Sequence, residues 1–412
     1  MRAALPLLLT LAMGACGPLS PPRPDGGLGG GLGGGLGGGL GGGTGGGTGG
    51  GTGGGLGGGT GGGTGGGTGG GLGGGTGGGT TGGGAGGGGG LRPFSWTRLT
   101  FNPVPTRAVT SQEVRGLARR PSGELWVALS DGTVYRAAPG SDVLTLVPGF
   151  PVPTGSTELR SLAATDTEVL LLRGATVMAC SSACTAFADF GTVLTLTFGE
   201  DGQDLCTKGA RGFLTVDAVT GGLYELERDG GAVSFVQRSA NLGVGDVAGC
   251  SIAETGDVYV AGDTGVALFR TGGGVVTEPI DLMGQPGAAW RDVATFASST
   301  ALTGFLVGGG SGYRSAQRLA GTWNSLPPDT SGALLTTVLA LAADEALAGG
   351  VANGGSTAAP GILGWNGARF TALSPPAPAF EVQQSPAVSA DEVYFAGGER
   401  TGGGYVVVRG TR

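Results

Sequence analysis

The sequence predicts an all-β fold that follows a long glycine-rich segment, and three observations predict it. Charged residues make up only 13% of the chain, which suits strands and tight turns better than solvated helices. Short apolar runs alternate with turns rich in Gly, Asp, Ser and Thr from residue 91 to the C-terminus. These runs recur in groups with a period of about 45 residues, a length typical of one four-stranded repeat.

The first fifteen residues have the features of a secretory signal peptide. Arg2 precedes a short apolar core that ends in small residues. The run Met13-Gly14-Ala15-Cys16 then resembles the lipobox of bacterial lipoproteins, in which the cysteine is lipidated and becomes the new N-terminus. The resemblance implies an exported protein that Cys16 anchors to the membrane through a lipid, and Gly17 favours the outer membrane. The alternative is an ordinary signal peptide that is cut nearby.

Residues 16–90 predict a disordered tether. Residues 18–24 are rich in proline, which favours an extended polyproline conformation, and residues 26–90 repeat Gly-Gly-Gly-Leu and Gly-Gly-Gly-Thr units. The period of four excludes a collagen helix, which needs glycine at every third position. A flexible chain of this length spans roughly 40–50 Å. We therefore divide the chain into a signal peptide (1–15), a tether (16–90) and one domain (91–412).

Seven repeat units can be counted in the domain. Each is anchored on an apolar residue that precedes a turn and a second β-rich run. The anchors are Leu117, Leu162, Leu196, Val247, Val293, Leu339 and Pro386. Four short strands per unit are typical of the blades of a β-propeller. The last unit is too short for a fourth strand, but Phe94–Leu99 is similar to the run Gly321–Leu326 of an earlier unit. We predict seven four-stranded blades closed by this N-terminal strand, with six or eight as alternatives.

One recurring pattern extends the comparison to known families. A Trp and a Leu-Pro pair are followed by an Asp-[Glu/Val]-Val-[Tyr/Phe] run and an Ala-Gly pair, and Asp391–Gly397 fits this run. This pattern resembles the repeats of bacterial secreted propellers of the Asp-box, Kelch and photosystem-assembly-factor-like groups. The resemblance implies a propeller fold and no particular activity, because the full Asp-box is absent and Ser130–Thr133 is only a fragment of it.

Composition excludes several classes of function. The sequence contains no histidine, which excludes Ser-His-Asp and Cys-His catalysis, His-ligated zinc and imidazole acid–base chemistry. The net charge of −7 and the absence of a clustered basic run argue against a nucleic-acid partner. We therefore predict a protein that is not an enzyme and that uses no cofactor and no metal.

Beyond Cys16, four cysteines remain, and an even number in an exported domain predicts disulfides. Cys180 and Cys184 are spaced to close a small loop, and Cys206 and Cys250 to join the third unit to the fourth. Three pairings remain open at this point. A metal site is the alternative, but no histidine or compact acidic group supports it.

The candidate ligand face consists of Arg115, Arg160, Arg291 and Trp290. The three arginines precede the expected inner strands, where we expect them to line one mouth of the channel; capping and pairing between blades is the alternative. Trp290 follows a Gly-Gln-Pro-Gly loop and is the best candidate for an exposed anchor. We interpret the recurring acidic residues as turn caps rather than as a catalytic pair; they are Asp131, Asp201, Asp204, Glu254, Asp257, Asp263, Asp391 and Glu392.

These observations predict a monomeric, lipid-anchored cell-envelope protein whose propeller binds a protein or glycan partner without catalysis. Two alternatives remain open. One is a glycan-active hydrolase or lyase, which needs two carboxylates roughly 5–10 Å apart at the propeller mouth. The other is a purely structural envelope protein.

Overall fold

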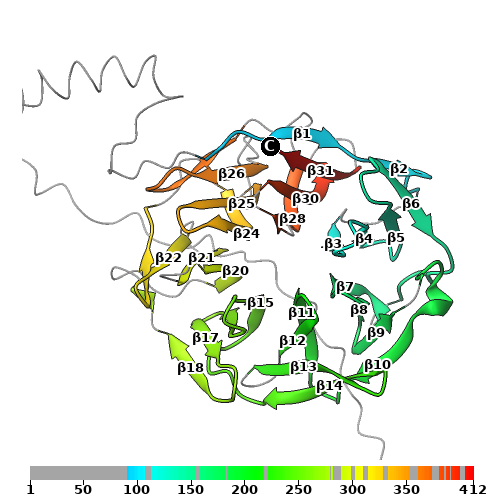
Figure 1. The fold of residues 1–412 in the computed structure, drawn as a ribbon, viewed down its shortest axis with the longest axis horizontal. Helices are drawn as coiled ribbons and strands as arrows, with labels where there is room; N and C mark the ends of the chain where they lie inside the picture. The colour runs from blue at the N-terminus through cyan, green and yellow to red at the C-terminus, as the bar shows by residue number, and fades with distance from the viewer. Residues whose placement is uncertain are drawn as a thin grey trace, which may run out of the picture. The chain divides into compact units, whose positions relative to one another are not determined.

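The computed structural model describes residues 91–106, 113–154, 157–181, 183–217, 221–278, 280–281, 289–297, 302–309, 314–327, 333–352, 361–373, 380–384, 387–389, 391–399 and 404–412. Seven antiparallel sheets stand around a central axis, so the domain is a seven-bladed β-propeller (Figure 1). The predicted fold and blade number are confirmed. Cys16, the signal peptide and the tether lie outside the described residues.

The first four blades follow one another along the chain. Blade 1 contains β3 (Val114–Arg119), β4 (Leu125–Leu129), β5 (Val134–Ala137) and β6 (Val143–Val147), with β2 (Thr100–Asn102) in parallel along β6. Blade 2 contains β7 (Leu159–Ala164), β8 (Val169–Arg173), β9 (Thr176–Cys180) and β10 (Gly191–Thr195), with the 3-10 helix η3 (Phe187–Asp189) before β10. Blade 3 contains β11 (Asp201–Lys208), β12 (Arg211–Asp217), β13 (Gly222–Asp229) and β14 (Ala232–Ser239). Blade 4 contains β15 (Val247–Ile252), β16 (Val258–Gly262), β17 (Gly265–Phe269) and β18 (Val275–Glu278).

The last three blades complete the ring. Blade 5 contains β20 (Ala289–Ala297), β21 (Leu302–Gly309), β22 (Arg314–Leu319) and β23 (Thr322–Ser325), with β19 (Ile280–Asp281) along β23. Blade 6 contains β24 (Ala333–Ala342), β25 (Glu345–Ala352), β26 (Ile362–Trp365) and β27 (Phe370–Ala372). Blade 7 contains β28 (Phe380–Gln384), β30 (Glu392–Glu399), β31 (Tyr405–Thr411) and β1 (Ser95–Arg98), and β29 (Ala387–Ser389) also pairs with β30.

The hydrophobic core lies between neighbouring blades rather than inside one sheet. Strands such as β4 and β16 are buried at every position because each face of a blade packs on another blade. Tyr259 of blade 4, for example, packs with Leu306 and Trp323 of blade 5. This arrangement explains why the central strands are continuous apolar runs in the sequence. The edges of the inner strands line the central channel.

The N-terminal strand closes the ring, as the sequence predicts. β1 pairs antiparallel with β31 (Figure 1). In this pairing, Trp96 lies opposite Gly410. Arg98 also forms an ion pair of 2.5 Å with Glu399, the last residue of β30. The two ends of the domain therefore belong to one sheet, which covers an edge of blade 7 that would otherwise be open.

The predicted register of the third unit is wrong. Leu196 precedes the inner strand, which is β11, so Leu205 occupies the position that we assigned to Leu196. The outer strand of blade 2, β10, is joined to the inner strand of blade 3 by a short connection that contains apolar residues and resembles a strand in sequence. The seventh anchor, Pro386, lies outside the described residues; the inner strand of blade 7 is β28.

Both predicted disulfides are present. Cys180 is bonded to Cys184 within blade 2, and Cys206 is bonded to Cys250 between the inner strands of blades 3 and 4. The second bond is the covalent link between blades that the sequence predicts. In the part of the chain that the structure describes, no helix is long and apolar enough to cross a membrane.

Candidate functional site

The seven inner strands run in the same direction around the channel. Ser161 contacts Asp204 of the next blade, and three residues further along both strands the Thr207 hydroxyl donates to the Ala164 carbonyl (2.7 Å). All the inner strands therefore begin at one face of the ring, which we call the top face, and end at the other, the bottom face. The connections that lead into inner strands cross the top face.

Every inner strand contains a register shift at the same place, near its beginning at the top face. Such a bulge turns one extra side chain away from the sheet. The residues at this bulge position are Arg115, Arg160, Gln203, Ala248, Arg291, Thr336 and Gln383. None of these side chains is buried, whereas the residue before each of them is buried. The bulges thus build a ring of accessible side chains around the top mouth of the channel.

The three predicted arginines all occupy the bulge position, but two of them are neutralised. Arg115 forms an ion pair with Glu113 (2.6 Å) and does not line the central cavity. Arg160 lines the cavity and forms an ion pair of 2.5 Å with Asp201. Arg291 lines the cavity and is exposed, and no described residue forms an ion pair with it. The three arginines therefore do not make one anion-binding cluster.

The expectation that Trp290 is an exposed anchor is wrong. Its exposed fraction is 2%, and it belongs to the core between blades 4 and 5. Trp290 lies immediately before the bulge of its inner strand, as Val114 and Leu159 do in theirs, and all three residues are buried. The bulge places Arg291, and not its neighbour, at the surface.

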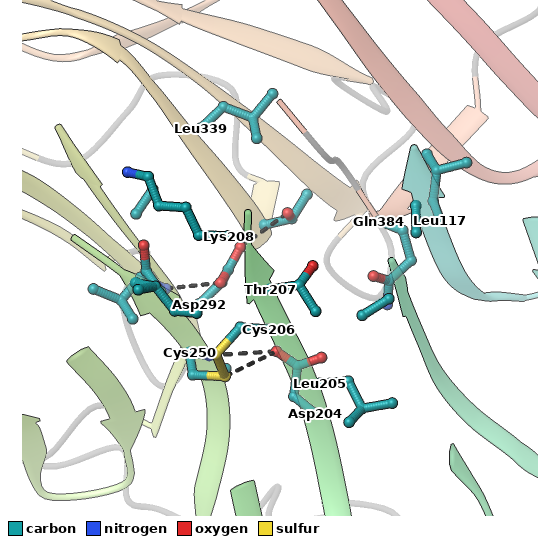
Figure 2. Close-up of a pocket in the computed structure, with 18 of the residues that line it drawn as sticks. Leu117, Asp204, Leu205, Cys206, Thr207, Lys208, Cys250, Asp292, Leu339 and Gln384 are labelled. Atoms are coloured by element: carbon teal, nitrogen blue, oxygen red, sulfur yellow. Dashed lines mark hydrogen bonds between the residues drawn. A yellow bond between two sulfur atoms is a disulfide. The ribbon is translucent and has the colours of Figure 1, made fainter. Parts of the chain in front are cut away.

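Two carboxylates in the channel wall connect neighbouring blades. Asp204 accepts hydrogen bonds from the Ser161 hydroxyl of blade 2 (3.0 Å) and the Cys250 amide of blade 4 (3.3 Å). Asp292 accepts hydrogen bonds from the hydroxyl of Thr337 and the amide of Val338 in blade 6, both at 2.9 Å. Figure 2 shows both carboxylates in the wall, with the Cys206–Cys250 disulfide beside Asp204. The predicted turn position of Asp204 is wrong, since this residue lies within β11, and no sequence pattern predicts the role of Asp292 within β20.

Burial dominates the electrostatics of both carboxylates. Desolvation raises the pKa of Asp204 to about 6, against the hydrogen bonds from Ser161 and Cys250, which favour the charged form. Desolvation and the charge of Asp204 together raise the pKa of Asp292 to about 7, against the hydrogen bonds from Val338 and Thr337. The two side chains are therefore coupled, and both hold a proton more readily than an exposed aspartate does.

The central cavity has a volume of about 550 Å³ and is lined by the inner strands of all seven blades. Its lining is largely polar and includes Gln203, Thr336, Gln383 and Gln384. Lys208 near the bottom face is paired with Glu254 (2.6 Å). In the described ranges, no group of three or more Cys, Asp or Glu side chains could hold a metal ion. Such a cavity suits a polar segment or small ligand that binds by hydrogen bonds.

The top face carries an acidic cluster over blades 3 and 4, which we define as Asp201, Asp217, Asp246 and Asp263. Desolvation raises the pKa of Asp217, and the charges of Asp246, Asp201 and Asp263 raise it further. Desolvation also raises the pKa of Asp263, with Asp246 adding to the shift and Arg291 opposing it. Apart from the pair with Arg160, no member forms an ion pair within the described part of the chain. This side of the mouth is therefore negatively charged.

The top face also carries the most exposed large apolar side chains of the described residues. Val104, Val152 and Phe198 have exposed fractions of 67%, 59% and 108%. Each lies on the connection that leads into the inner strand of blade 1, 2 or 3, respectively. The other exposed large apolar residues reach at most 48%; they lie on outer strands or, for Leu319, next to a bottom-face turn. Sequence reasoning missed this group because exposure has no local sequence pattern.

Comparisons with known proteins agree on the fold alone. No protein-family model and no curated protein matches the sequence. Virginiamycin B lyase from Staphylococcus aureus is similar in structure (TM-score 0.56, 11% identity, covering 78% of this chain and 100% of that chain). YCF48 bound to a D1 peptide is also similar (TM-score 0.56, 10% identity, covering 78% of this chain and 97% of that chain). The WD40 repeats of RRP9 are similar too (TM-score 0.55, 13% identity, covering 77% of this chain and 97% of that chain). The class that these similarities define is the β-propeller, in which binding proteins and enzymes both occur.

Proposed function

We propose that this protein is an exported, lipid-anchored component of the cell envelope whose propeller binds a protein or glycan partner at its top face and does not act as an enzyme. The observation that carries the proposal is the placement of Val104, Val152 and Phe198. Three strongly exposed apolar side chains on neighbouring blades of one face are typical of a binding surface, whereas single exposed apolar residues are not.

The two disulfides support an oxidising location, because structural disulfides persist in secreted and periplasmic proteins. The channel carboxylates favour binding over catalysis. Oxygens of Asp204 and Asp292 already accept hydrogen bonds from the neighbouring blades, so these groups serve the joints between blades. A catalytic pair would need at least one carboxylate free to reach a substrate.

Binding at the top face predicts that a charge placed there strongly reduces capture of the partner. The full chain, solubilised in detergent and immobilised, is expected to retain a specific protein or glycan from envelope extract of its own host. Val152→Asp places a charge on the top face and should reduce retention at least tenfold, because burying an unpaired carboxylate in an interface is costly. Leu319→Asp, on the bottom face, is the matched control and should retain the partner normally. Retention of nothing by the wild-type chain, or equal loss in both variants, would reject the proposed binding face.

If a lipid on Cys16 anchors the protein, replacement of Cys16 should release the protein from the membrane fraction. Cys16→Ser removes the thiol that would carry the lipid, so the protein should move from the membrane pellet to the soluble fraction of lysed cells. Ser20→Ala is a control close in sequence and should remain with the membrane. A Cys16→Ser protein that still sediments with membranes would show that the anchor is not at this cysteine.

A further inference from the structure

The connection into blade 3 presents Phe198 on a fixed turn. The turn runs from Thr197 to Glu200, where the Glu200 amide donates to the Thr197 carbonyl (3.1 Å). One oxygen of the Glu200 carboxylate accepts hydrogen bonds from the Thr197 amide (2.9 Å) and hydroxyl (2.8 Å). The other oxygen accepts a hydrogen bond from the Tyr224 hydroxyl at 2.6 Å. Gly199 has a φ of 92°, which other residues adopt only with strain.

Both ends of this turn are attached to the body of the propeller. The Leu196 amide donates to the Ala175 carbonyl (2.8 Å), and the Leu196 side chain is buried in the core between blades 2 and 3. After the turn, Asp201 is held by the ion pair with Arg160. Phe198 is the large apolar side chain of the turn, and it projects into solvent. Because the hydrogen bonds fix the backbone of the turn, a partner that covers the ring has only the side-chain rotamers left to order.

The acidic cluster lies beside this turn. Asp201 follows Phe198 by three residues and is paired across the sheet with Asp217, and Asp217 is close enough to Asp246 and Asp263 for their charges to act on it. The surface next to the exposed ring is therefore negative. An anionic glycan would be repelled there, whereas Lys or Arg side chains of a protein would be attracted.

The geometry points to a protein partner that accepts the Phe198 ring in an apolar pocket and places Lys or Arg side chains of the pocket border against the acidic cluster. This inference rests on the proposed function, since it names the chemistry of the partner bound at the top face. Phe198 supplies the central anchor, and the carboxylates supply orientation and a faster encounter. Full burial of a phenyl side chain corresponds to roughly a 10- to 150-fold gain in affinity.

The first part of the test locates the partner by photocrosslinking. The full chain carries p-benzoylphenylalanine in place of Phe198, is expressed in cells of its own host and is irradiated. A protein adduct is expected from position 198. The matched control replaces Val276, an exposed apolar residue on the outer strand of blade 4, and should give no adduct with the same protein. An adduct at both positions, or a glycan as the only captured species, overturns the inference.

The second part measures affinity between the purified crosslinked partner and the full chain in detergent. Phe198→Ala should weaken binding about 30-fold or more, as expected for a central anchor. The double variant Asp246→Asn and Asp263→Asn should weaken it about tenfold at about 50 mM salt and much less at about 300 mM, because salt screens the attraction. Val276→Ala should bind as the wild type does.

The two proposals can fail separately. If the wild-type chain binds a partner but the Phe198 and Asp246/Asp263 variants bind it equally well, the inference is wrong and the proposed function stands. Tighter binding by the Asp246/Asp263 variant would show an anionic partner surface and would also overturn the inference. If the wild-type chain binds nothing and the chain with p-benzoylphenylalanine at position 198 gives no adduct, both proposals fail.

Discussion

A chain that begins at residue 100 is expected to lose most of its stable fold, whereas a chain that begins at residue 91 should unfold like the full-length protein. The shorter chain lacks β1 together with Leu91, Phe94 and Trp96, which pack on the core between blades 6 and 7. Burial of two or three large apolar side chains is worth roughly 5 kcal/mol, which is comparable with the whole stability of many domains. The edge of β31 also becomes exposed, so we expect aggregation. Urea unfolding and size-exclusion chromatography measure both effects.

A single substitution keeps this prediction testable if the truncated chain cannot be purified. The Trp96 ring lies directly over Gly410, where an added Cβ would approach it to 2.7 Å, and it also contacts the Phe395 ring. Trp96→Ala should lower the free energy of unfolding by about 2–3 kcal/mol, less than a fully buried tryptophan because the side chain is half-buried. An unchanged urea midpoint for both the residue-100 chain and Trp96→Ala would show that β1 does not close the ring.

The domain is expected to lose stability as the pH rises from about 4.5 to about 8. The pKa values of Asp204 and Asp292 in the folded state are raised by burial to about 6 and about 7, so the folded state binds more protons than the unfolded state above pH 4. Their contribution is fully present below the unfolded pKa near 4 and is lost as the pH passes through the folded values. At 1.36 kcal/mol per pKa unit, the loss between pH 4.5 and pH 8 is on the order of 5 kcal/mol for the pair. Urea unfolding across this pH range measures it.

The double variant Asp204→Asn and Asp292→Asn is the matched comparison. An amide keeps one oxygen as an acceptor for the Cys250 or Val338 amide but cannot ionise, so the slope between pH 4.5 and 8 should largely disappear. Glu168 acts in the opposite sense at lower pH. Burial opposes its ionisation, but the hydrogen bonds from Arg228 and Thr165 lower its pKa to about 2, so its contribution is lost as the pH falls from about 4.5 towards 2. If the free energy of unfolding of the wild type does not change from pH 5 to 8, the pKa values of Asp204 and Asp292 are not raised by burial.

The blades could be predicted from sequence because the signals that form them are local. The run around Trp96 and the run around Trp323 share a Trp and a Leu at the same spacing, and both form outer strands. This similarity was sufficient to predict the closure of the ring. The same reasoning misplaced the inner strand of blade 3, because an apolar residue in a short connection, Leu196, has the local environment of a strand residue.

The candidate site could not be predicted in the same way, because it depends on contacts between blades about 45 residues apart. A carboxylate in a strand has no sequence pattern that says whether it faces solvent or the next blade. The predicted turn position of Asp204 is therefore wrong, and the sequence alone predicts no role for Asp292. The exposure of Arg291 and the burial of Trp290 depend on a bulge between them, and a shift of one residue exchanges their places. Phe198 was missed because its importance lies in the absence of contacts.

The closure of the ring sets an order of events during synthesis. The ribosome makes β1 first and β31 last, and the ion pair between Arg98 and Glu399 joins residues 301 positions apart. Until the last strand emerges, the outer strand of blade 7 has no sheet to join, and such distant pairing is slow to form. A chain that stops before Tyr405 leaves β1 unpaired even though six blades are complete. A finished C-terminus is therefore a condition for a closed ring, and incomplete chains expose a strand edge that marks them for aggregation or degradation.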